Sequence, residues 1–309
     1  MHRRTWKRLA VVAAGIACGA VALWLYHGST ALVLRAERVR LPHLAPGDDG
    51  LRVAVLSDPH FDGSDGDRAA MIAERINRLR PDLILLLGDF INGDPDPRRS
   101  LPMEQLARFV GSLRARCGVF AVTGNHELWY DRGEVLRAVA AGGAADLTNR
   151  SVVIRTPSGN ALALAGLPDY TTELPAPCPD LPAGLPALIL MHDPNSARFV
   201  PPATGLILAG HTHGGQIRLW PEGGADSSLR LLMARLMGWL GMIPPWKRPC
   251  ALFDRGFMEY RGRRLFITSG AGGNRVKLRV FCPPELVLLE LRGAGSAAGE
   301  KPFAPVREI

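Results

Sequence analysis

The sequence lacks the patterns that assign a chain to several common classes of protein. It has no internal repeat and no low-complexity run. It has no P-loop and no G-x-S-x-G, so nucleotide-driven transfer and serine esterase chemistry have no support. The cysteines contain no C-x-x-C pair, which supports neither a zinc ribbon nor a disulfide framework. We expect them to pack in the core or in loops; they are Cys18, Cys117, Cys178, Cys250 and Cys282.

Charge of one sign is not concentrated along the chain. The 37 Lys and Arg residues and 29 Asp and Glu residues give a net charge of +8, and the bases are scattered except near the N-terminus. This balance fits an anionic substrate or a membrane surface and argues against a nucleic-acid partner. With 309 residues, 47% of them hydrophobic, the chain can bury a substantial core.

A basic N-terminal segment, residues 1–8, precedes an uncharged stretch, residues 9–26. As a helix this stretch would span about 27 Å, at roughly 1.5 Å per residue, close to the thickness of a bilayer's hydrocarbon layer. We therefore predict a single-pass N-terminal membrane anchor. A cleaved signal segment is the alternative, but the stretch is long for one and no clear A-x-A site follows. The run RRTWKR also resembles a degenerate twin-arginine export signal.

The side of the membrane that holds the rest of the chain stays open. Basic residues before the stretch favour a cytoplasmic N-terminus and an extracytoplasmic domain. Arg35, Arg38 and Arg40 follow on the far side and weaken this assignment. Residues 27–50, with Pro46 and Gly47, are expected to be a linker.

From residue 51 onward, short apolar runs alternate with helical patterns. Residues 53–56 and 83–87 predict buried strands, and residues 118–127 predict a third strand that ends in Asn125, His126 and Glu127. Between them, apolar spacing predicts helices over 67–80 and over about 102–114. This alternation implies largely parallel strands with both faces covered. In such sheets ligands gather at the carboxyl ends of the strands.

Each predicted strand, including two later ones at 187–191 and 205–209, is followed by a side chain that can bind a metal. Taken singly, these residues have ordinary explanations as helix caps, turn residues or a buried histidine. Their joint occurrence predicts a metal centre. The candidate ligands are Asp58, His60, Asp89, Asn125, His192, His211 and His213.

The stretch GHTHGGQI, residues 210–217, places two histidines one residue apart among glycines. On a strand, side chains alternate with period two, so both imidazoles point the same way and suit a divalent transition metal. An exposed polar turn is the alternative explanation of this pair taken alone. The glycines allow the backbone to approach a metal closely.

The motif series resembles the calcineurin-like metallophosphoesterases over about residues 51–292. It consists of D-x-H, 28 intervening residues, D, 35 intervening residues, N-H-E, a lone His and G-H-x-H. GHTHGGQI, with Arg275 and CPPELVLLEL at 282–291, is similar to the membrane-associated, single-anchor branch. Members of that branch are implicated in the hydrolysis of lipid-linked phosphates.

The resemblance implies a four-layer α/β/β/α sandwich with two metal ions at the strand ends. The first metal site corresponds to Asp58, His60 and His213. The second corresponds to Asn125, His192 and His211, and Asp89 bridges the two. His126 is implied to be catalytic, as the proton or hydrogen-bond donor to the leaving group.

The ligand types indicate which ions and which chemistry to expect. Four histidines, two carboxylates and an amide suit Mn, Fe, Zn or Co better than Mg or Ca. Two carboxylates leave the dinuclear site with a net positive charge, which attracts a phosphate ester. Ions roughly 3.5–4 Å apart can hold a bridging hydroxide as nucleophile.

Two positions depart from the family pattern. Glu127 stands where relatives often have Asp, and either orients the ligands or is a solvated loop acid. Asn92 stands where the family often has an acid, and we expect it to be structural. Rival metal enzymes fit poorly, because Gly215 and Gln216 break both H-x-H-x-D-H and a histidine triad.

Residues 226–246 form an apolar insertion soon after the last candidate ligand. A helix is expected to begin at 226–228 and to run toward Gly238 or Gly241. It is either an ordinary core helix or a flap that contacts lipid. Trp239 and Trp246, with basic residues just beyond, fit an interfacial position.

Together these patterns predict a membrane-anchored, metal-dependent phosphohydrolase, with residues 293–309 as a tail. The expected substrate is a lipid-linked phosphate ester or a pyrophosphate such as UDP-diacylglucosamine. One alternative is a phosphodiesterase for soluble nucleotides, which leaves the insertion unexplained. The other is a non-catalytic membrane scaffold, which would have lost a ligand or His126, whereas all eight positions are present.

Overall fold

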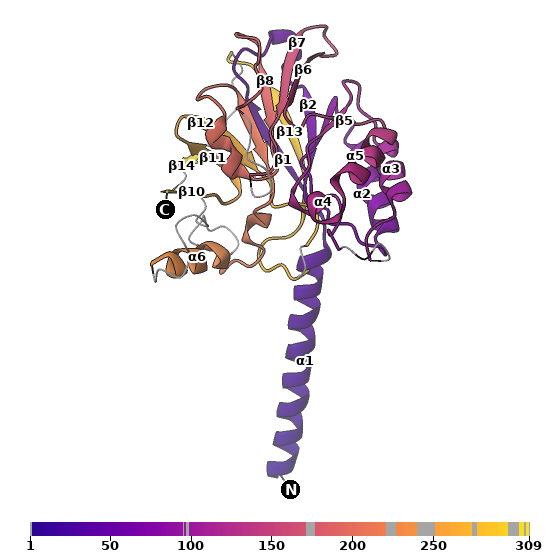
Figure 1. Cartoon of the computed structure of the whole chain (residues 1–309). Coiled ribbons are helices and arrows are strands. Elements are labelled where there is room, and N and C mark those ends of the chain that lie inside the picture. Colours follow the sequence, from indigo (N-terminus) through magenta and orange to yellow (C-terminus); the bar gives the residue numbers. More distant parts are fainter. Residues whose placement is uncertain are drawn as a thin grey trace.

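Two mixed β-sheets lie face to face and enclose the main core of the computed structural model (Figure 1). Leucine and valine side chains from both sheets meet between them, for example Val53 and Leu85 from one and Leu164 and Leu208 from the other. The structure describes residues 2–94, 96, 99–170, 177–220, 227–239, 251–273, 277–295, 303–305 and 307–308.

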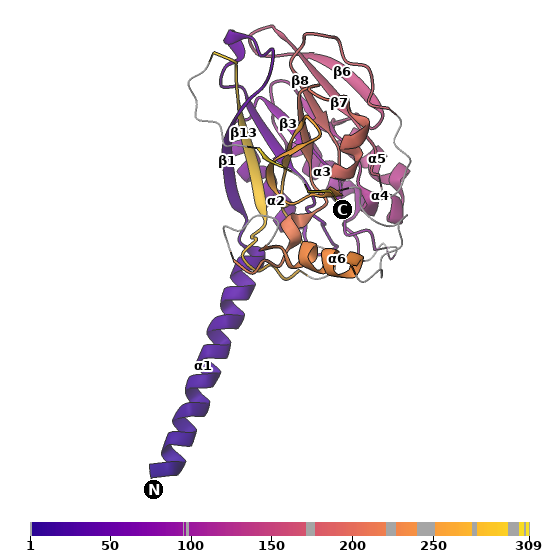
Figure 2. The ribbon, with the colours of Figure 1, turned by 90° about the vertical axis from the view of Figure 1, so that its left-hand side faces the viewer.

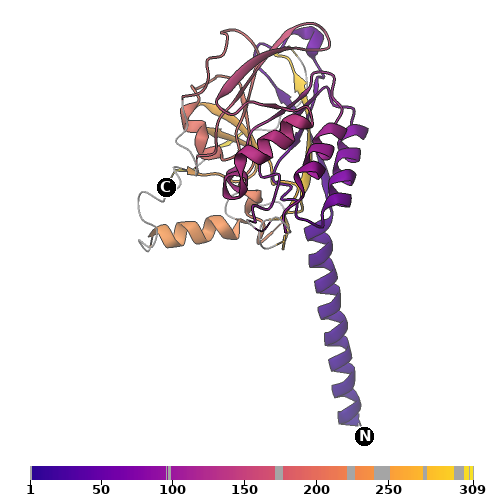
Figure 3. The same cartoon turned by 45° about the vertical axis from the view of Figure 1, so that its right-hand side comes forward.

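The first sheet contains four neighbouring parallel strands, β2 to β5, followed on the other side of β2 by antiparallel β13 and then β1. In sheet order the strands are β1 (Val33–Arg40), β13 (Glu285–Arg292), β2 (Arg52–Leu56), β3 (Leu83–Leu86), β4 (Val119–Ala121) and β5 (Ala145–Asp146). Three helices cover its outer face (Figure 3): α2 (Gly66–Arg78), α3 (Met103–Ser112) and α5 (Arg132–Ala141). Their apolar sides are buried there, as Ile72 and Ile76 of α2 illustrate.

The second sheet has a parallel centre, β7-β8-β9-β12, with antiparallel neighbours on both sides. In sheet order its strands are β14 (Ala304–Pro305), β11 (Gly256–Tyr260), β12 (Arg263–Ile267), β9 (Leu206–Ala209), β8 (Ala187–Leu190), β7 (Ala161–Gly166) and β6 (Arg150–Arg155). Its outer apolar face packs against the 3-10 helix η2 (Pro194–Phe199). The remaining short elements are η1 (Pro46–Asp48), α4 (Asn125–Tyr130), η3 (His213–Gly215), β10 (Ala251–Leu252) and β15 (Arg307–Glu308).

The predicted sandwich and its strand-helix alternation are confirmed, with three differences. Residues 33–40, inside the range expected to be a linker, form β1 and pair with β13. The run after β4 turns into a helix, so Asn125 begins α4. In the described part of the chain, the outer layer on the second sheet is a 3-10 helix with connecting segments, thinner than the helical layer on the first.

The N-terminal helix α1 (His2–Thr30) projects from one end of the domain (Figures 1 and 2). It contains a candidate membrane span, Val12–Thr30, with mean hydropathy 1.4 and no fully buried residue, and only its C-terminal part contacts the domain. The helix α6 (Leu229–Trp239) forms most of the described part of the predicted apolar insertion, and that part begins at Ser227. Trp246, Lys247, Arg248 and Arg275 lie outside the described residues.

Candidate metal centre

The carboxyl ends of the parallel strands bring the predicted ligands to one site. Asp58 and Asp89 follow β2 and β3 of the first sheet, and His192 and His211 follow β8 and β9 of the second. Neighbouring parallel strands end at the same edge, so residues far apart in the chain converge there. Six of the seven candidate ligands are buried, with 0–5% of each residue exposed, and His211 is half-buried.

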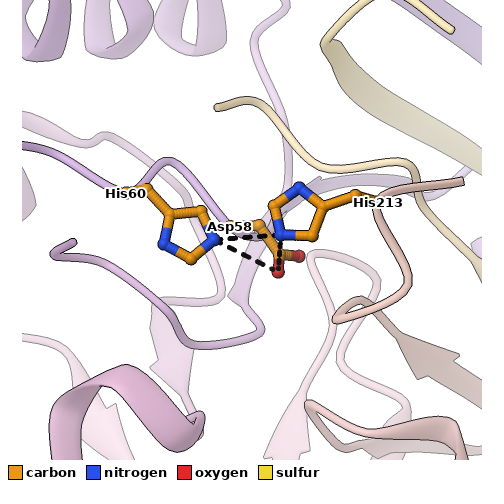
Figure 4. A group of neighbouring side chains, drawn as sticks. All are labelled: Asp58, His60 and His213. Carbon is orange, nitrogen blue, oxygen red and sulfur yellow. Dashed lines mark hydrogen bonds and ion pairs between the residues drawn. The ribbon is translucent and has the colours of Figure 1, made fainter. Parts of the chain in front are cut away.

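The first cluster consists of Asp58, His60 and His213 (Figure 4). The Nε2 atoms of His60 and His213 are 3.0 Å apart, and Oδ1 of Asp58 lies 3.3 Å from Nε2 of His213 and 3.8 Å from Nε2 of His60. Three ligand atoms thus point at one small volume from two loops, the one after β2 and the one after β9. Two imidazoles and a carboxylate are a donor set that suits a divalent transition metal.

The second cluster consists of Asp89, His192 and His211. Nε2 of His192 lies 3.1 Å from Oδ2 of Asp89 and 3.1 Å from Nδ1 of His211. The same Oδ2 of Asp89 is 3.6 Å from Nε2 of His60, which belongs to the first cluster. Asp89 therefore lies between the two clusters, where a bridging ligand would have to be.

Two buried acceptor atoms at the site have no hydrogen-bond partner among the described residues. They are Oδ1 of Asp58 and Oδ1 of Asn125. A buried polar atom without a partner costs about 1–3 kcal/mol. Cations bound in the two ligand sets would satisfy one oxygen each, so the donor set fits divalent metal ions.

The backbone at the site adopts the left-handed conformation, which residues other than glycine rarely take. Five candidate ligands have left-handed φ values between 45° and 63°: Asp58, His60, Asp89, His211 and His213. Each such residue costs about 1–3 kcal/mol, and strain of this kind clusters where function requires it. The strained turns direct five side chains into the site.

Glycine is required where the loops approach one another. A Cβ atom on Gly124 would lie 2.3 Å from Oδ1 of Asp89 and 2.7 Å from the ring of His192. A Cβ atom on Gly210 would lie 2.5 Å from Oδ2 of Asp58. Both glycines therefore allow carboxylate ligands to lie directly against backbone.

Glu127 is fully buried, so the alternative of a solvated loop acid is wrong. Its carboxylate accepts hydrogen bonds from the backbone N–H groups of Asp89 (2.8 Å), Phe90 (2.7 Å) and Gly124 (2.7 Å). It joins the loop after β3 to the start of α4. Burial, together with the neighbouring Asp89 carboxylate, raises the pKa of Glu127 to about 7.

His126 lies beside both clusters, and the side of its ring that faces away from them makes a hydrogen bond. Its Nδ1 lies 2.6 Å from the backbone carbonyl of Asn92, which can only accept, so Nδ1 carries the hydrogen. Its Nε2 is then the atom that faces the site, 3.8 Å from Oδ2 of Asp89. The side chain of Asn92 bonds to Asp94, Arg99 and Ser100, in agreement with the structural role expected for it.

Sequence reasoning missed two buried arginines that support the histidine loop. Arg279 lies 3.2 Å from Nδ1 of His213 and donates to the carbonyls of Ser269 and Gly272. Arg218 donates to the carbonyl of Gly214 and forms an ion pair with buried Asp254. Arg218 directly follows GHTHGGQI, which could have drawn attention to it, whereas no spacing pattern identifies Arg279.

The pKa values of the imidazoles at the site are shifted in different directions. Burial by itself favours the neutral form of His192, but the carboxylates of Asp89 and Asp58 outweigh burial and raise its pKa well above the usual value. Burial lowers the pKa of His60 to about 4 and also holds the pKa of His213 well below its usual value. At neutral pH, His60 and His213 are free to bind a metal, whereas His192 must first lose a proton.

Loading the metal-free protein with Mn²⁺ at pH 7 is therefore expected to release a proton from His192. Because binding releases a proton, metal affinity rises with pH, by about tenfold per unit for one proton below the pKa of His192. Titration calorimetry in two buffers with different ionisation enthalpies measures this release. His27→Asn, on α1, is the matched control and retains it; loading with no proton released would contradict the assignment.

Comparison with known proteins agrees with the geometry of this centre. The family model described as calcineurin-like phosphoesterase matches residues 51–215. A phosphodiesterase of Escherichia coli, YaeI, is 30% identical over 82% of this chain and 87% of its own length. An uncharacterized metallophosphoesterase of Aquifex aeolicus is 25% identical over 90% of this chain and 99% of its own. A Bos taurus transmembrane protein with a metallophosphoesterase domain is 28% identical over 58% of this chain and 44% of its own.

Proposed function

The chain belongs to the calcineurin-like phosphoesterase family and is a metal-dependent phosphoesterase, and on this basis we propose that α1 anchors it in a membrane, where it hydrolyses a lipid-linked phosphate diester or pyrophosphate. UDP-diacylglucosamine is a representative of this substrate class. A single-pass anchor of this kind holds the catalytic domain against the lipid surface from which the substrate comes.

The observation that carries the proposal is the short path from α1 to the metal centre. Ser29, in the last turn of α1, accepts a hydrogen bond of 2.8 Å from the backbone N–H of Arg279. The guanidinium group of Arg279 in turn lies 3.2 Å from Nδ1 of the candidate ligand His213. The site therefore lies at the end of the domain from which the candidate span emerges, within reach of a lipid headgroup.

We assign the ligands in two sets that share one residue. Asp58, His60 and His213 would hold one ion, Asn125, His192 and His211 would hold the other, and Asp89, which lies between the two sets, would serve both. When bound, the two ions supply an activated water and neutralise charge on the phosphoryl oxygens. The protein's part is to fix these ligands in place, through the Glu127 carboxylate on one side and Arg279 on the other.

His126 is assigned to the leaving group, because its Nε2 faces the site while Asn92 holds its Nδ1. Next to it, Trp129 lies 4.4 Å from the His126 ring between ring centres, and its side chain is half exposed. Leu128 is also exposed beside it. These two side chains offer an apolar surface to a leaving group that carries acyl chains or an aromatic base.

Hydrolysis by the full chain in phosphatidylcholine vesicles, loaded with Mn²⁺, tests this proposal. The panel contains a lipid-linked pyrophosphate, a lipid phosphodiester and a soluble cyclic nucleotide diester. We expect kcat/KM for one of the lipid substrates to exceed that for the nucleotide by about 100-fold or more, because binding energy from the lipid part lowers the barrier. A preference for the soluble nucleotide would contradict the lipid assignment and favour the nucleotide phosphodiesterase.

A further inference from the structure

The helix α6 has an apolar face with no described partner. Leu229, Met233 and Leu236 recur at spacings of four and three residues, so they share one side of the helix, and they are 38%, 47% and 48% exposed. Leu231 is buried and faces the domain. An ordinary core helix would bury the first three side chains, so the core-helix interpretation of this insertion is wrong for its described part.

Neighbouring segments continue this apolar face. Leu219 and Trp220 follow the histidine motif and are about half exposed, and Phe281 is 36% exposed. We call this set the apolar platform; its members are Leu219, Trp220, Leu229, Met233, Leu236 and Phe281.

Backbone hydrogen bonds join the segments of the platform to one another, and an aromatic contact joins the platform to α1. The N–H of Leu229 donates to Ile217, and the N–H of Leu219 donates to Ser227, which joins α6 to the segment after the histidine motif. That segment is joined to the loop before Phe281 through Arg218 and Val280. The ring of Phe281 packs edge-on against Trp24 of α1, with ring centres 5.2 Å apart. The platform is therefore a fixed surface that is continuous with the candidate span.

Exposed apolar side chains are concentrated around this end of the molecule. In the part of the chain that the structure describes, every exposed large apolar side chain except Val153 belongs to α1, to the start of β1, to α4 or to the platform. A contiguous apolar surface of this kind marks an interaction site. Val153 belongs to β6, a strand that lies at the opposite end of the domain from α1 (Figure 1).

The orientation of α6 identifies the partner. In Figures 1, 2 and 3, α6 lies at the end of the domain where α1 enters, and the α6 axis runs crosswise to the axis of α1. If α1 crosses a bilayer, α6 lies in the plane of its surface, the orientation of an interfacial amphipathic helix. Trp220 suits this depth, where tryptophan is enriched, and Phe281 is of a type found on the apolar side of interfacial segments.

We propose that the apolar platform inserts into the interfacial layer of the membrane that α1 spans, as a second membrane contact that fixes the tilt of the domain. This inference rests on the proposed anchoring by α1. A single helix would leave the domain free to swing, whereas two contacts hold the metal centre toward the lipid surface. The platform side chains are uncharged, so insertion does not require anionic lipids.

Photo-crosslinking of the full chain in phosphatidylcholine vesicles tests the proposal. The photoreactive residue p-benzoylphenylalanine replaces Leu236 in the platform, Leu23 in α1 as the anchored reference, or Val153 as the matched exposed control. We expect lipid adducts at Leu236 and Leu23, both at least about tenfold above those at Val153, because only the first two positions enter the apolar layer. Mass spectrometry of the crosslinked chain identifies the adducts.

Each other outcome overturns a different statement. Adducts at Leu23 but none at Leu236 above the Val153 level would overturn the platform and leave the anchoring intact. Adducts to protein instead of lipid at Leu236 would assign the face to a second copy or another protein. No lipid adduct at Leu23 would overturn the anchoring itself, and with it the proposed function.

A triple variant gives an independent readout. Leu229→Ser, Met233→Ser and Leu236→Ser together are expected to lower hydrolysis of the vesicle-borne substrate by about tenfold or more, because interfacial binding scales with buried apolar area. Hydrolysis of a soluble aryl phosphodiester by the same variant should stay unchanged, since these residues are outside the metal centre. Equal loss on both substrates, or loss on neither, would overturn the role of the platform.

Discussion

Asp89→Ala is expected to abolish hydrolysis and to remove most of the bound metal. The carboxylate of Asp89 lies 3.1 Å from Nε2 of His192 and 3.6 Å from Nε2 of His60, one residue from each cluster. Losing it weakens both sites at once, so the rate should fall by more than the roughly 10²–10³-fold that one lost electrostatic contact costs. Elemental analysis and initial rates of the same preparation measure the two effects together.

Asp180→Ala is the matched control, because Asp180 is an exposed carboxylate that belongs to neither cluster. Asp89→Asn preserves the shape of the side chain and separates loss of charge from loss of packing. If Asp89→Ala keeps two ions per chain, Asp89 is not the bridging ligand.

His126→Ala is expected to keep both metal ions and to lose about 10²–10⁴-fold in rate on substrates with poor leaving groups. The ring of His126 is positioned by the carbonyl of Asn92, with Nε2 toward the site. When the ring is protonated, Nε2 carries a second hydrogen, which passes to the departing alkoxide or phosphate; the alanine variant has no such donor. An aryl phosphate with a good leaving group needs little protonation, so its rate should fall much less.

Metal content decides between two roles for this histidine, since His126 also lies near Asp89 and His60 in a possible ligand group. Loss of an ion from His126→Ala would make it a ligand, and equal rate loss on both kinds of substrate would rule out proton donation. His27→Ala, an exposed histidine on α1, serves as the control.

Much of the site could be predicted from the sequence because its ligands follow the strands of a parallel sheet. Each apolar run predicts a strand, and the polar residue just after it, Asp58, Asp89 or His192, is the predicted ligand. The strain at these residues could not be predicted. Nothing in the sequence indicates that Asp58, His60 and Asp89 adopt left-handed backbone conformations, because those depend on how the loops meet.

Contacts between segments far apart in the chain could not be predicted from the sequence either. Arg279 reaches His213 across 66 residues, and the pair of Arg218 with Asp254 spans 36. The sequence predicts a linker where β1 forms, because apolar and polar residues alternate only weakly there and pairing with β13 decides the conformation. The insertion could be recognised as apolar, but only the fold determines that Leu229 and Leu236 face outward.

The central claim is that one dinuclear centre joins the two halves of the chain through Asp89. Anomalous diffraction from crystals of the full chain loaded with Mn²⁺ tests it most directly. We expect two peaks, one bonded to His60 and His213, the other to His192 and His211, and both to the carboxylate of Asp89. A single peak, or two peaks that do not share Asp89, would contradict the account.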